Sequence, residues 1–337
     1  MQGNDITVII AAYNASATIQ LAVESALAHT EVKEVIVVDD ASSDDTAVFA
    51  KQAANYDSRF ELIVFEENRG PSAARNAAIA ATSAPMIAIL DADDIFLPQR
   101  FTHLLSAQDW DLIADNIVFC RNFDQLASTS PELNEDISLN EISVALNLQQ
   151  FVEGNISRRN RQRSELGFVK PVIRRGFLEQ HGIRYKEDCR LGEDFLLYCE
   201  CLIKGGRLKL NGSIGYSALV RDDSLSSGHS VDDLRTLSRH SADLSKSYGL
   251  SVDEVTALKL HTDSILRRIQ HRDVLSVRRE EGVLRGVLKA SQNPRSFIDL
   301  INDKLNTRAV DKQTPRLLFN RDQLLKYAPS NEEKMVR

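Results

Sequence analysis

The stretch Met86-Ile87-Ala88-Ile89-Leu90-Asp91-Ala92-Asp93-Asp94 leads from an apolar run straight into three carboxylates. The run has the length of a strand buried on both faces, and open α/β sheets bind ligands at the carboxyl ends of such strands. Asp91 and Asp93 are two residues apart, so on a regular strand their side chains point the same way. Two oxyanions this close repel each other unless a cation lies between them. The stretch therefore indicates either a divalent-metal site that carries a diphosphate or a solvated acidic turn.

The residues around this stretch alternate between β-rich and helical patterns. β-rich runs occur at residues 6–10, 35–38 and 62–65, and each is followed by helical spacing or by helix-capping residues. Together with the opening stretch, this alternation predicts a parallel sheet with helices on its faces. Further strands are expected at 110–115, ending in Asp115, and at 208–210 and 214–220. From about residue 231 the pattern is helical.

The turns that follow the strands distinguish between nucleotide-binding folds. No G-x-G-x-x-G follows the first strand and no G-x-x-x-x-G-K-[ST] occurs, so a dinucleotide-binding Rossmann fold and a P-loop are not favoured. Polar residues follow four of the strands instead: Tyr13 and Asn14, Asp39 and Asp40, Asn68 and Arg69, and Asp91 and Asp93. Solvation alone does not require polar residues at four successive strand ends. The pattern therefore predicts a binding site at this edge of the sheet.

Two later segments carry charged residues that are open to two interpretations. Residues 158–175 contain seven cationic side chains: Arg158, Arg159, Arg161, Arg163, Lys170, Arg174 and Arg175. They form either a solvated face or a contact for a phosphate, a pyrophosphate or an anionic membrane surface. Glu193 and Asp194 precede an amphipathic helix, where a carboxylate serves either as a helix cap or as a general base on a fixed element. A second basic cluster lies at 267–279.

The composition is that of an ordinary globular protein without membrane spans. The 337 residues are 43% hydrophobic and 26% charged, and no apolar run approaches the roughly 18 residues of a span. The formal charge of −7 argues against a nucleic-acid partner. Residues 6–12 follow Asp5 rather than basic residues, which argues against a signal peptide, so a cytoplasmic location is expected. The four cysteines lack zinc-site spacing, and buried, reduced thiols are expected.

With these residues in view, the chain resembles the inverting nucleotide-sugar glycosyltransferases of family 2, which have the GT-A fold. The resemblance covers residues 6–220 in the expected order. The matching segments are Val8–Asn14, Val37–Ser42, Asn68–Asn76, Leu90–Asp94 and Gly192–Asp194. It implies an α/β fold with an open, mainly parallel sheet flanked by helices and with a helical C-terminal extension. It also implies three parts: a nucleotide-sugar-binding half (1–100), an acceptor-binding and catalytic half (101–228) and a helical region (229–337).

The resemblance assigns roles to individual residues. Asp194 would be the general base, with Glu193 as the weaker candidate. In the DXD motif, Asp91 would face the ribose or the metal and Asp93 would ligate Mn²⁺ or Mg²⁺, and His229 could add a ligand. The remaining nucleotide-sugar contacts would be Ala11, Ala12, Tyr13, Asp40, Asn68 and Arg75. Arg158, Arg159, Lys170 and Arg221 would contact the acceptor or the diphosphate.

The implied reaction transfers a hexose, with glucose favoured, from a UDP-sugar to a hydroxyl group with inversion. The acceptor would be a polyprenyl-diphosphate-linked oligosaccharide of a succinoglycan-like bacterial exopolysaccharide, reached from the cytoplasmic face of the membrane. Peripheral membrane contact and a homodimer through the C-terminal helices are further expectations.

Three alternatives to a transferase fit the sequence less well. A sugar-phosphate nucleotidyltransferase needs a glycine-rich phosphate loop, which residues 11–15 lack. An aspartate-nucleophile phosphohydrolase would carry its D-x-D on the first strand rather than the fourth. A non-catalytic nucleotide-sugar-binding scaffold would be expected to lose the metal-binding or the base carboxylate, and both are present.

Overall fold

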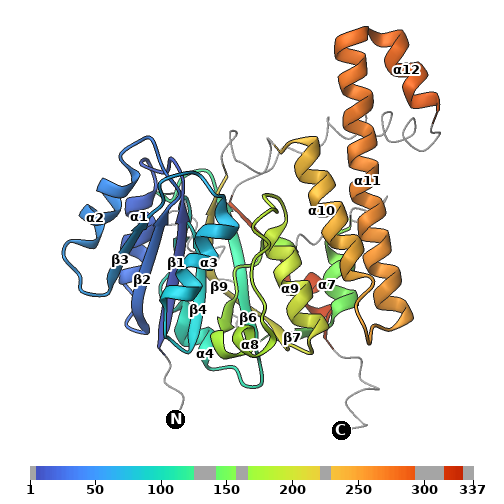
Figure 1. Cartoon of the computed structure of the whole chain (residues 1–337). Helices are drawn as coiled ribbons and strands as arrows, with labels where there is room; N and C mark the ends of the chain where they lie inside the picture. Colours follow the sequence, from blue (N-terminus) through green and yellow to red (C-terminus); the bar gives the residue numbers. More distant parts are fainter. Residues whose placement is uncertain (1–4, 125–141, 157–165, 221–228, 293–314, 329–337) are drawn as a thin grey trace, which may run out of the picture.

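A ten-stranded sheet forms the centre of the molecule in the computed structural model, which describes residues 5–124, 142–156, 166–220, 229–292 and 315–328. Its strands are hydrogen-bonded in the order β3-β2-β1-β4-β8-β6-β9-β5, while β7 pairs with β9 and β10 pairs with β6. Helices flank the sheet (Figure 1). The mainly parallel sheet with helical flanks and a helical C-terminal part confirms the predicted fold class.

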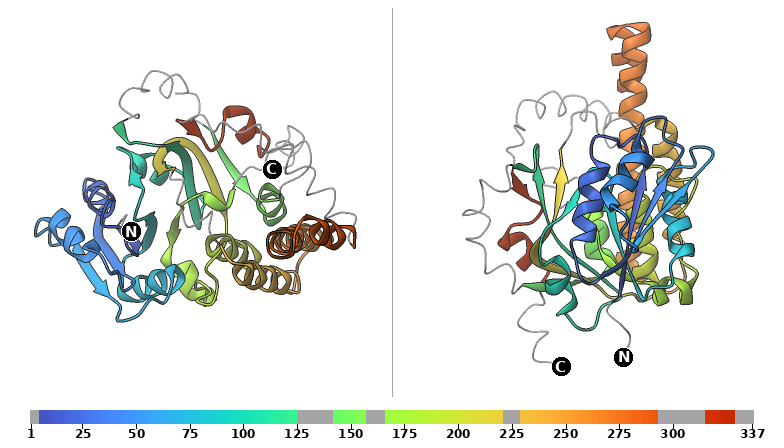
Figure 2. Two further views of the ribbon diagram at one scale, coloured as in Figure 1. Left: turned by 90° about the horizontal axis from the view of Figure 1, so that it is seen from above. Right: turned by 90° about the vertical axis from the view of Figure 1, so that its left-hand side faces the viewer.

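The first half of the sheet consists of four parallel strands and their connecting helices. The strands are β1 (Ile6–Ala12), β2 (Val32–Asp39), β3 (Phe60–Val64) and β4 (Met86–Asp91). The helices are α1 (Ile19–Leu27), α2 (Thr46–Ala54) and α3 (Pro71–Ala81). Right-handed crossovers place α1 and α2 together on one face and α3 on the other (Figure 2). Residues 86–90 are fully or almost fully buried, as the apolar run predicts.

The second half of the sheet contains antiparallel pairs. β8 (Val172–Arg174) runs antiparallel to both β4 and β6 (Leu112–Cys120), and β9 (Leu208–Leu219) runs parallel to β6. The shorter elements are β5 (Ile95–Phe96), α4 (Arg100–Leu105), β7 (Ser143–Leu146), α7 (Leu148–Gly154), a 3₁₀ turn (Leu166–Phe168), α8 (Arg175–His181) and α9 (Glu193–Ile203). Because β4, β8 and β6 are neighbours, the sheet continues across the predicted boundary at residue 100. The division into parts remains a prediction.

Two predicted strand boundaries differ from the structure. The strand expected at 110–115 continues to Cys120, and Asp115 lies buried inside it rather than at an acidic end. A buried carboxylate is tolerated there because Arg100 Nη2 lies 3.0 Å from Asp115 Oδ1. The strands expected at 208–210 and 214–220 form one strand, β9, which pairs with β6 with an irregular register near Asn116.

The C-terminal part is mainly helical, as predicted. It contains α10 (Val231–Leu244), α11 (Val252–Glu281), α12 (Val283–Ser291) and α14 (Arg321–Leu325). Ser230 and Ser251 begin α10 and α11 with capping boxes. The short strand β10 (Arg316–Leu317) returns the chain to the sheet beside β6, where the side chain of Asn116 bonds both backbone groups of Phe319 at 2.8 and 3.0 Å.

None of the helices that the structure describes is both long enough and apolar enough to cross a membrane. All four cysteines are buried and unpaired, as predicted.

Candidate active site

The carboxyl ends of β1, β2 and β4 meet at one edge of the sheet, as the polar strand ends predict. In the paired strands Ala12 lies opposite Asp39, and Ala11 lies opposite Asp91. Tyr13 follows β1 and is 46% exposed, whereas Ala12 is buried. These positions leave one aromatic side chain accessible above a row of small and acidic residues. The nucleotide contacts assigned to Ala11, Ala12 and Tyr13 remain predictions.

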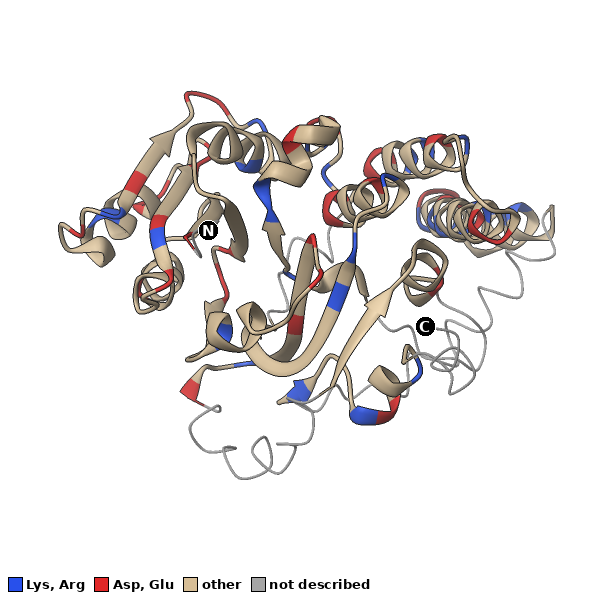
Figure 3. Cartoon of the chain, turned by 90° about the horizontal axis from the view of Figure 1, so that it is seen from below, with Lys and Arg blue, Asp and Glu red and all other residues tan. Residues whose placement is uncertain are grey.

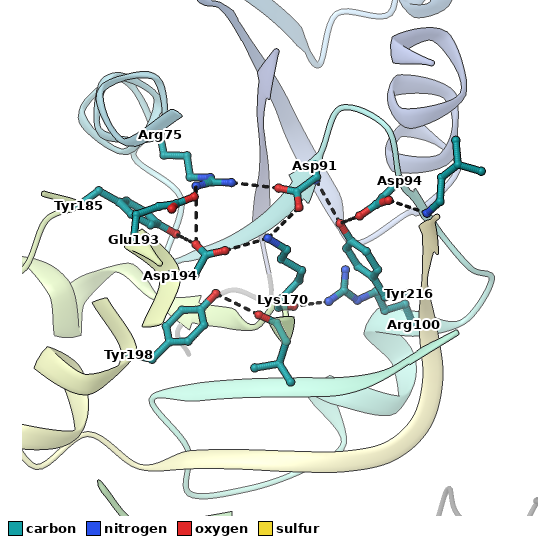
Figure 4. A network of polar contacts seen from close by, with 12 residues as sticks. Arg75, Asp91, Asp94, Arg100, Lys170, Tyr185, Glu193, Asp194, Tyr198 and Tyr216 are labelled. Atoms are coloured by element: carbon teal, nitrogen blue, oxygen red, sulfur yellow. Dashed lines mark hydrogen bonds and ion pairs between the residues drawn. The ribbon is translucent and has the colours of Figure 1, made fainter. Parts of the chain in front are cut away.

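Four charged side chains from four segments form a closed ring at this edge (Figure 4). Arg75, on α3, donates through Nη2 to Asp91 Oδ1 over 3.0 Å. Lys170 Nζ lies 2.8 Å from Asp91 Oδ2 and 2.8 Å from Asp194 Oδ2. Arg75 Nη1 lies 3.7 Å from Asp194 Oδ1 and closes the ring. The structure therefore connects the end of β4 to the start of α9 through two cations.

The ring is buried, so solvent screens its ion pairs only weakly. Arg75, Lys170 and Asp194 are each less than 10% exposed. Burial alone would raise the pKa of Asp91, but the charges of Lys170 and Arg75 lower it to about 2. Burial alone would lower the pKa of Lys170, but the carboxylates of Asp194 and Asp91 raise it. Asp91 and Lys170 are therefore both charged at neutral pH.

The first turn of α9 presents the two candidate bases. Glu193 Oε1 accepts from Arg75 Nη1 over 2.9 Å, and Asp194 Oδ1 accepts from the hydroxyl of Tyr185 over 3.1 Å. The positive end of the helix dipole favours carboxylates at this position. The turn before it needs Gly192, whose φ of 72° lies in the left-handed region and whose missing side chain leaves room for Leu237. The backbone thus aims both carboxylates into the ring.

Hydrogen bonds to the backbone carbonyls of Val169 and Lys170 hold the segment that carries the Lys170 side chain. The Lys170 carbonyl accepts a short hydrogen bond from Arg100 Nη2, which also bonds Asp115. The carbonyl of the preceding residue, Val169, accepts from the hydroxyl of Tyr198 over 3.1 Å. The ammonium group is therefore fixed by backbone contacts as well as by its two carboxylate partners. The predicted contact of Lys170 with the acceptor or diphosphate remains a prediction.

Asp94 has a different environment from Asp91. Its Oδ2 accepts from the hydroxyl of Tyr216 over 2.7 Å, and its Oδ1 accepts from the amide of Leu219 over 2.9 Å. Burial and the neighbouring charges of Asp91 and Asp93 raise its pKa well above the ordinary value. The tyrosine hydroxyl also accepts from the Asp91 amide over 3.1 Å. Tyr216 therefore fixes the turn that carries the DXD motif to β9.

Sequence reasoning did not identify Tyr185 or Tyr216. Each contacts a carboxylate of the site through its phenol, yet neither belongs to a matching segment. Tyr216 is separated from Asp94 by 122 residues. The pairing of β5 with β9 brings the two together, so no local spacing signals the contact.

The carboxylate of Asp40 accepts hydrogen bonds from the backbone of the turn that precedes α3. Its two carboxylate oxygens accept from the amides of Arg69 and Gly70, over 2.7 and 2.8 Å. The side chain of Asn68 donates to the Asp40 carbonyl over 3.3 Å. Asp40 thus anchors the turn that leads into α3 and so positions Arg75. The nucleotide-sugar contacts assigned to Asp40 and Asn68 remain predictions.

Asp91 and Asp93 offer carboxylate oxygens to a divalent ion, and a bound diphosphate would supply further oxygen ligands. The described residues contain no group of three or more His, Cys, Asp or Glu side chains that could hold a metal ion, so Asp91, Asp93 and His229 do not form such a group. Asp91 has two cationic partners, and Asp93 is half-buried. Metal binding by any of the three remains a prediction. The candidate acceptor contacts Arg158, Arg159 and Arg221 lie outside the described residues.

Comparison with known proteins identifies the family. The model of "Glycosyl transferase family 2" matches residues 7–163. The succinoglycan biosynthesis protein ExoU of Rhizobium meliloti is 43% identical over 297 residues, which cover 88% of this chain and 86% of ExoU. The chain belongs to glycosyl transferase family 2. This confirms the predicted family.

Other similar proteins cover less of this chain than ExoU does or have a lower sequence identity. WfgD of Escherichia coli, named a UDP-Glc:alpha-D-GlcNAc-diphosphoundecaprenol beta-1,3-glucosyltransferase, is 34% identical over 115 residues, 34% of this family 2 chain and 43% of WfgD. TarS (residues 1–349) of Staphylococcus aureus, solved with UDP-GlcNAc, has a TM-score of 0.57 at 18% identity and covers 82% of this chain and 74% of the TarS chain. The Pyrobaculum calidifontis mannosyltransferase PcManGT, solved with GDP-Man and Mn²⁺, has a TM-score of 0.52 at 15% identity, with coverages of 87% and 80%. These two structures share the GT-A fold.

Proposed function

We propose that this family 2 enzyme transfers a hexosyl group, with glucose favoured, from a UDP-sugar to a hydroxyl group of a lipid-linked oligosaccharide. The observation that carries the proposal is the buried ring of Arg75, Asp91, Lys170 and Asp194. It joins the DXD end of β4, which suits a nucleotide diphosphate, to a carboxylate at a helix start, which suits a base. A candidate site for the leaving nucleotide and a candidate base for the acceptor thus lie at one edge of the sheet.

The leaving group is held at the β4 end of the ring. Negative charge grows on UDP as the glycosidic bond breaks, and the cationic groups of Arg75 and Lys170 lie next to that position. Asp93, with the diphosphate oxygens, would hold Mn²⁺ or Mg²⁺. The ion would act as a Lewis acid that neutralises the charge on UDP. The structure of PcManGT in complex with GDP-Man and Mn²⁺ supports metal use in this fold.

The acceptor is activated at the α9 end of the ring. Its hydroxyl oxygen attacks the anomeric carbon and forms the new glycosidic bond, while the bond to UDP breaks on the opposite face. Asp194 takes the hydroxyl proton, and Glu193 is the second candidate for this step. The Tyr185 hydroxyl fixes the orientation of the Asp194 carboxylate. A single displacement inverts the anomeric centre, so an α-linked UDP-glucose donor gives a β-linked product.

The names of two relatives support the proposed acceptor and pathway. ExoU is named for succinoglycan biosynthesis, and WfgD is named as acting on a sugar linked to diphosphoundecaprenol. We therefore propose a polyprenyl-diphosphate-linked acceptor in the synthesis of a bacterial exopolysaccharide, used at the cytoplasmic face of the membrane.

A donor panel tests this function. The purified chain is incubated with UDP-glucose, UDP-galactose, UDP-GlcNAc and GDP-mannose, with and without Mn²⁺, in the presence of polyprenyl-diphosphate-linked saccharides, and nucleotide release is measured. We expect release of UDP from UDP-glucose that depends on both acceptor and metal. UDP binding without any release would indicate a scaffold, and formation of UDP-glucose from UTP and glucose 1-phosphate would indicate a nucleotidyltransferase.

A further inference from the structure

The helix α12 exposes one continuous apolar face. Val283, Leu284, Val287 and Leu288 are exposed to 60, 88, 42 and 62%, respectively. Their spacing places all four on one side of an α-helix. We call these four residues the α12 apolar face. Large apolar side chains on a monomer's surface are usually scattered singly, so a group of four within one and a half turns indicates an interaction site.

The opposite side of α12 fixes this orientation. Gly286 and Ala290 are buried against α11. A Cβ at Gly286 would lie 2.6 Å from the Cβ of Arg278, so only glycine permits the two helices to pack this closely. The helix therefore cannot turn its apolar face inward without losing that contact.

The segment of the chain that carries the α12 apolar face is basic in an acidic protein. Residues 267–291 contain seven Lys and Arg side chains and three Asp and Glu side chains, whereas the whole chain carries a formal charge of −7. Both signs of charge occur along α11 (Figure 3). Arg285 and Lys289 lie on α12 itself and are exposed. The apolar face is thus bordered by cations.

This face lies on the catalytic side of the molecule. α11 has 30 residues and is therefore about 45 Å long. It carries α12 beyond the sheet, on the side to which β1 runs from its start near the N-terminus (Figure 1). The side view agrees, since α11 rises above all other elements (Figure 2). The carboxyl end of β4, which contributes Asp91 to the ring, faces the same side.

We propose that α12 docks on the surface of an anionic phospholipid bilayer and inserts its apolar face between the headgroups. An apolar helix face bordered by Lys and Arg is the pattern of interfacial helices, and the cations complement acidic lipid headgroups. A second copy fits less well, because a symmetric pair of these faces would bring like charges together. Docking would hold the catalytic edge towards lipid-linked substrates. This inference concerns location and does not depend on which sugar is transferred.

Vesicle binding by the full chain tests the proposal. The protein is sedimented with vesicles of equal parts phosphatidylcholine and phosphatidylglycerol, and with vesicles of phosphatidylcholine alone. We expect binding to the anionic vesicles that weakens with salt. Leu284→Glu should lower the partition coefficient at least about tenfold, because a charge replaces a leucine that inserts into the bilayer. The double variant R285E/K289E should lower it by at least about fivefold for each charge removed.

Two control variants place a glutamate on α11, away from the α12 apolar face. Val252→Glu places a glutamate on an 82% exposed apolar residue at the far end of α11, and Lys259→Glu reverses an exposed charge on α11. Both should bind vesicles like the wild type. Equal binding of all variants, or no binding by the wild type, overturns the proposal.

Other occupants of the face give distinct results. If residues 293–314 cover it, Leu284→Glu lowers the melting temperature and the wild type does not bind vesicles. If a second copy covers it, Leu284→Glu changes the elution volume in size-exclusion chromatography, again without vesicle binding. Either result overturns membrane docking. Because the assay contains no sugar nucleotide, it can fail while the transferase activity is confirmed, and the reverse.

Discussion

Replacing Lys170 by methionine removes the ammonium group that separates Asp91 from Asp194. The lowered pKa of Asp91, about 2 instead of 3.8, corresponds to about 2.5 kcal/mol of stabilisation of its ionised form. Lys170 is the larger of the two cationic contributions, and its loss also leaves two buried carboxylates without their shared partner. Breaking a buried ion pair typically costs about 3–5 kcal/mol. Since the Asp91 side chain is 30% exposed, we expect a loss of about 3 kcal/mol in the free energy of unfolding at pH 7.

The stability deficit of Lys170→Met should change with pH in a defined direction. In the wild type the pKa of Asp91 is lowered, so its stabilising contribution is present above about pH 4 and is lost as the pH falls towards 2. In Lys170→Met the pKa of Asp91 should rise, because burial then opposes ionisation with one cation fewer. The variant's deficit is therefore largest at pH 7 and should shrink as the pH falls towards 4.5, where the carboxyl takes up a proton.

Urea unfolding measured at pH 7 and at pH 4.5 is the assay. Lys186→Met is the matched control, because Lys186 forms a 2.9 Å ion pair with Glu200 at a partly exposed site, where such pairs contribute less than about 1 kcal/mol. Lys170→Arg, which keeps the charge, should recover part of the stability. A Lys170→Met protein within about 0.5 kcal/mol of the wild type at pH 7, or a deficit that grows at low pH, would refute the electrostatic role of the ring.

Three further predictions concern single residues of the site. Asp93→Asn should remove the increase in UDP affinity that Mn²⁺ produces, as measured by titration calorimetry; equal affinities with and without Mn²⁺ in both proteins would show that the metal assignment is wrong. Asp194→Asn should bind UDP-sugar like the wild type but transfer about 10²–10⁴ times more slowly, as measured by UDP release; unchanged transfer would move the base to Glu193 or elsewhere. Tyr216→Phe should lower the free energy of unfolding by about 1–2 kcal/mol, because the hydroxyl that bonds Asp94 and the Asp91 amide is lost; a change below about 0.3 kcal/mol in urea unfolding speaks against that contact.

The sequence predicted the first half of the fold because its signals are local. The buried run at 86–90 and the β-rich runs before it alternate with helical segments, so the parallel sheet and its polar edge follow from spacing alone. Asp115 shows where local reasoning fails. A carboxylate normally marks a strand end, but here Arg100 neutralises it inside the strand, and that partner is visible only in three dimensions.

The charged ring was predicted only in its parts. Asp91, Arg75 and Asp194 were each singled out, and Lys170 appeared as one cation in a basic segment. Their contacts depend on how β8 and α9 pack against β4, across sequence separations that no periodicity records. Asp40 illustrates the same limit, since its two bonds to backbone amides give it a structural role that residue type alone does not reveal.

The most direct test of the proposed chemistry is UDP release from UDP-glucose by the wild type and by Asp194→Asn. Both proteins are supplied with Mn²⁺ and a polyprenyl-diphosphate-linked oligosaccharide, and the anomeric configuration of the product is determined by NMR. We predict acceptor-dependent release and a β-linked product for the wild type, and release that is about 10²–10⁴ times slower for the variant despite unchanged donor binding. An α-linked product, or equal release by both proteins, would contradict a single displacement in which Asp194 is the base.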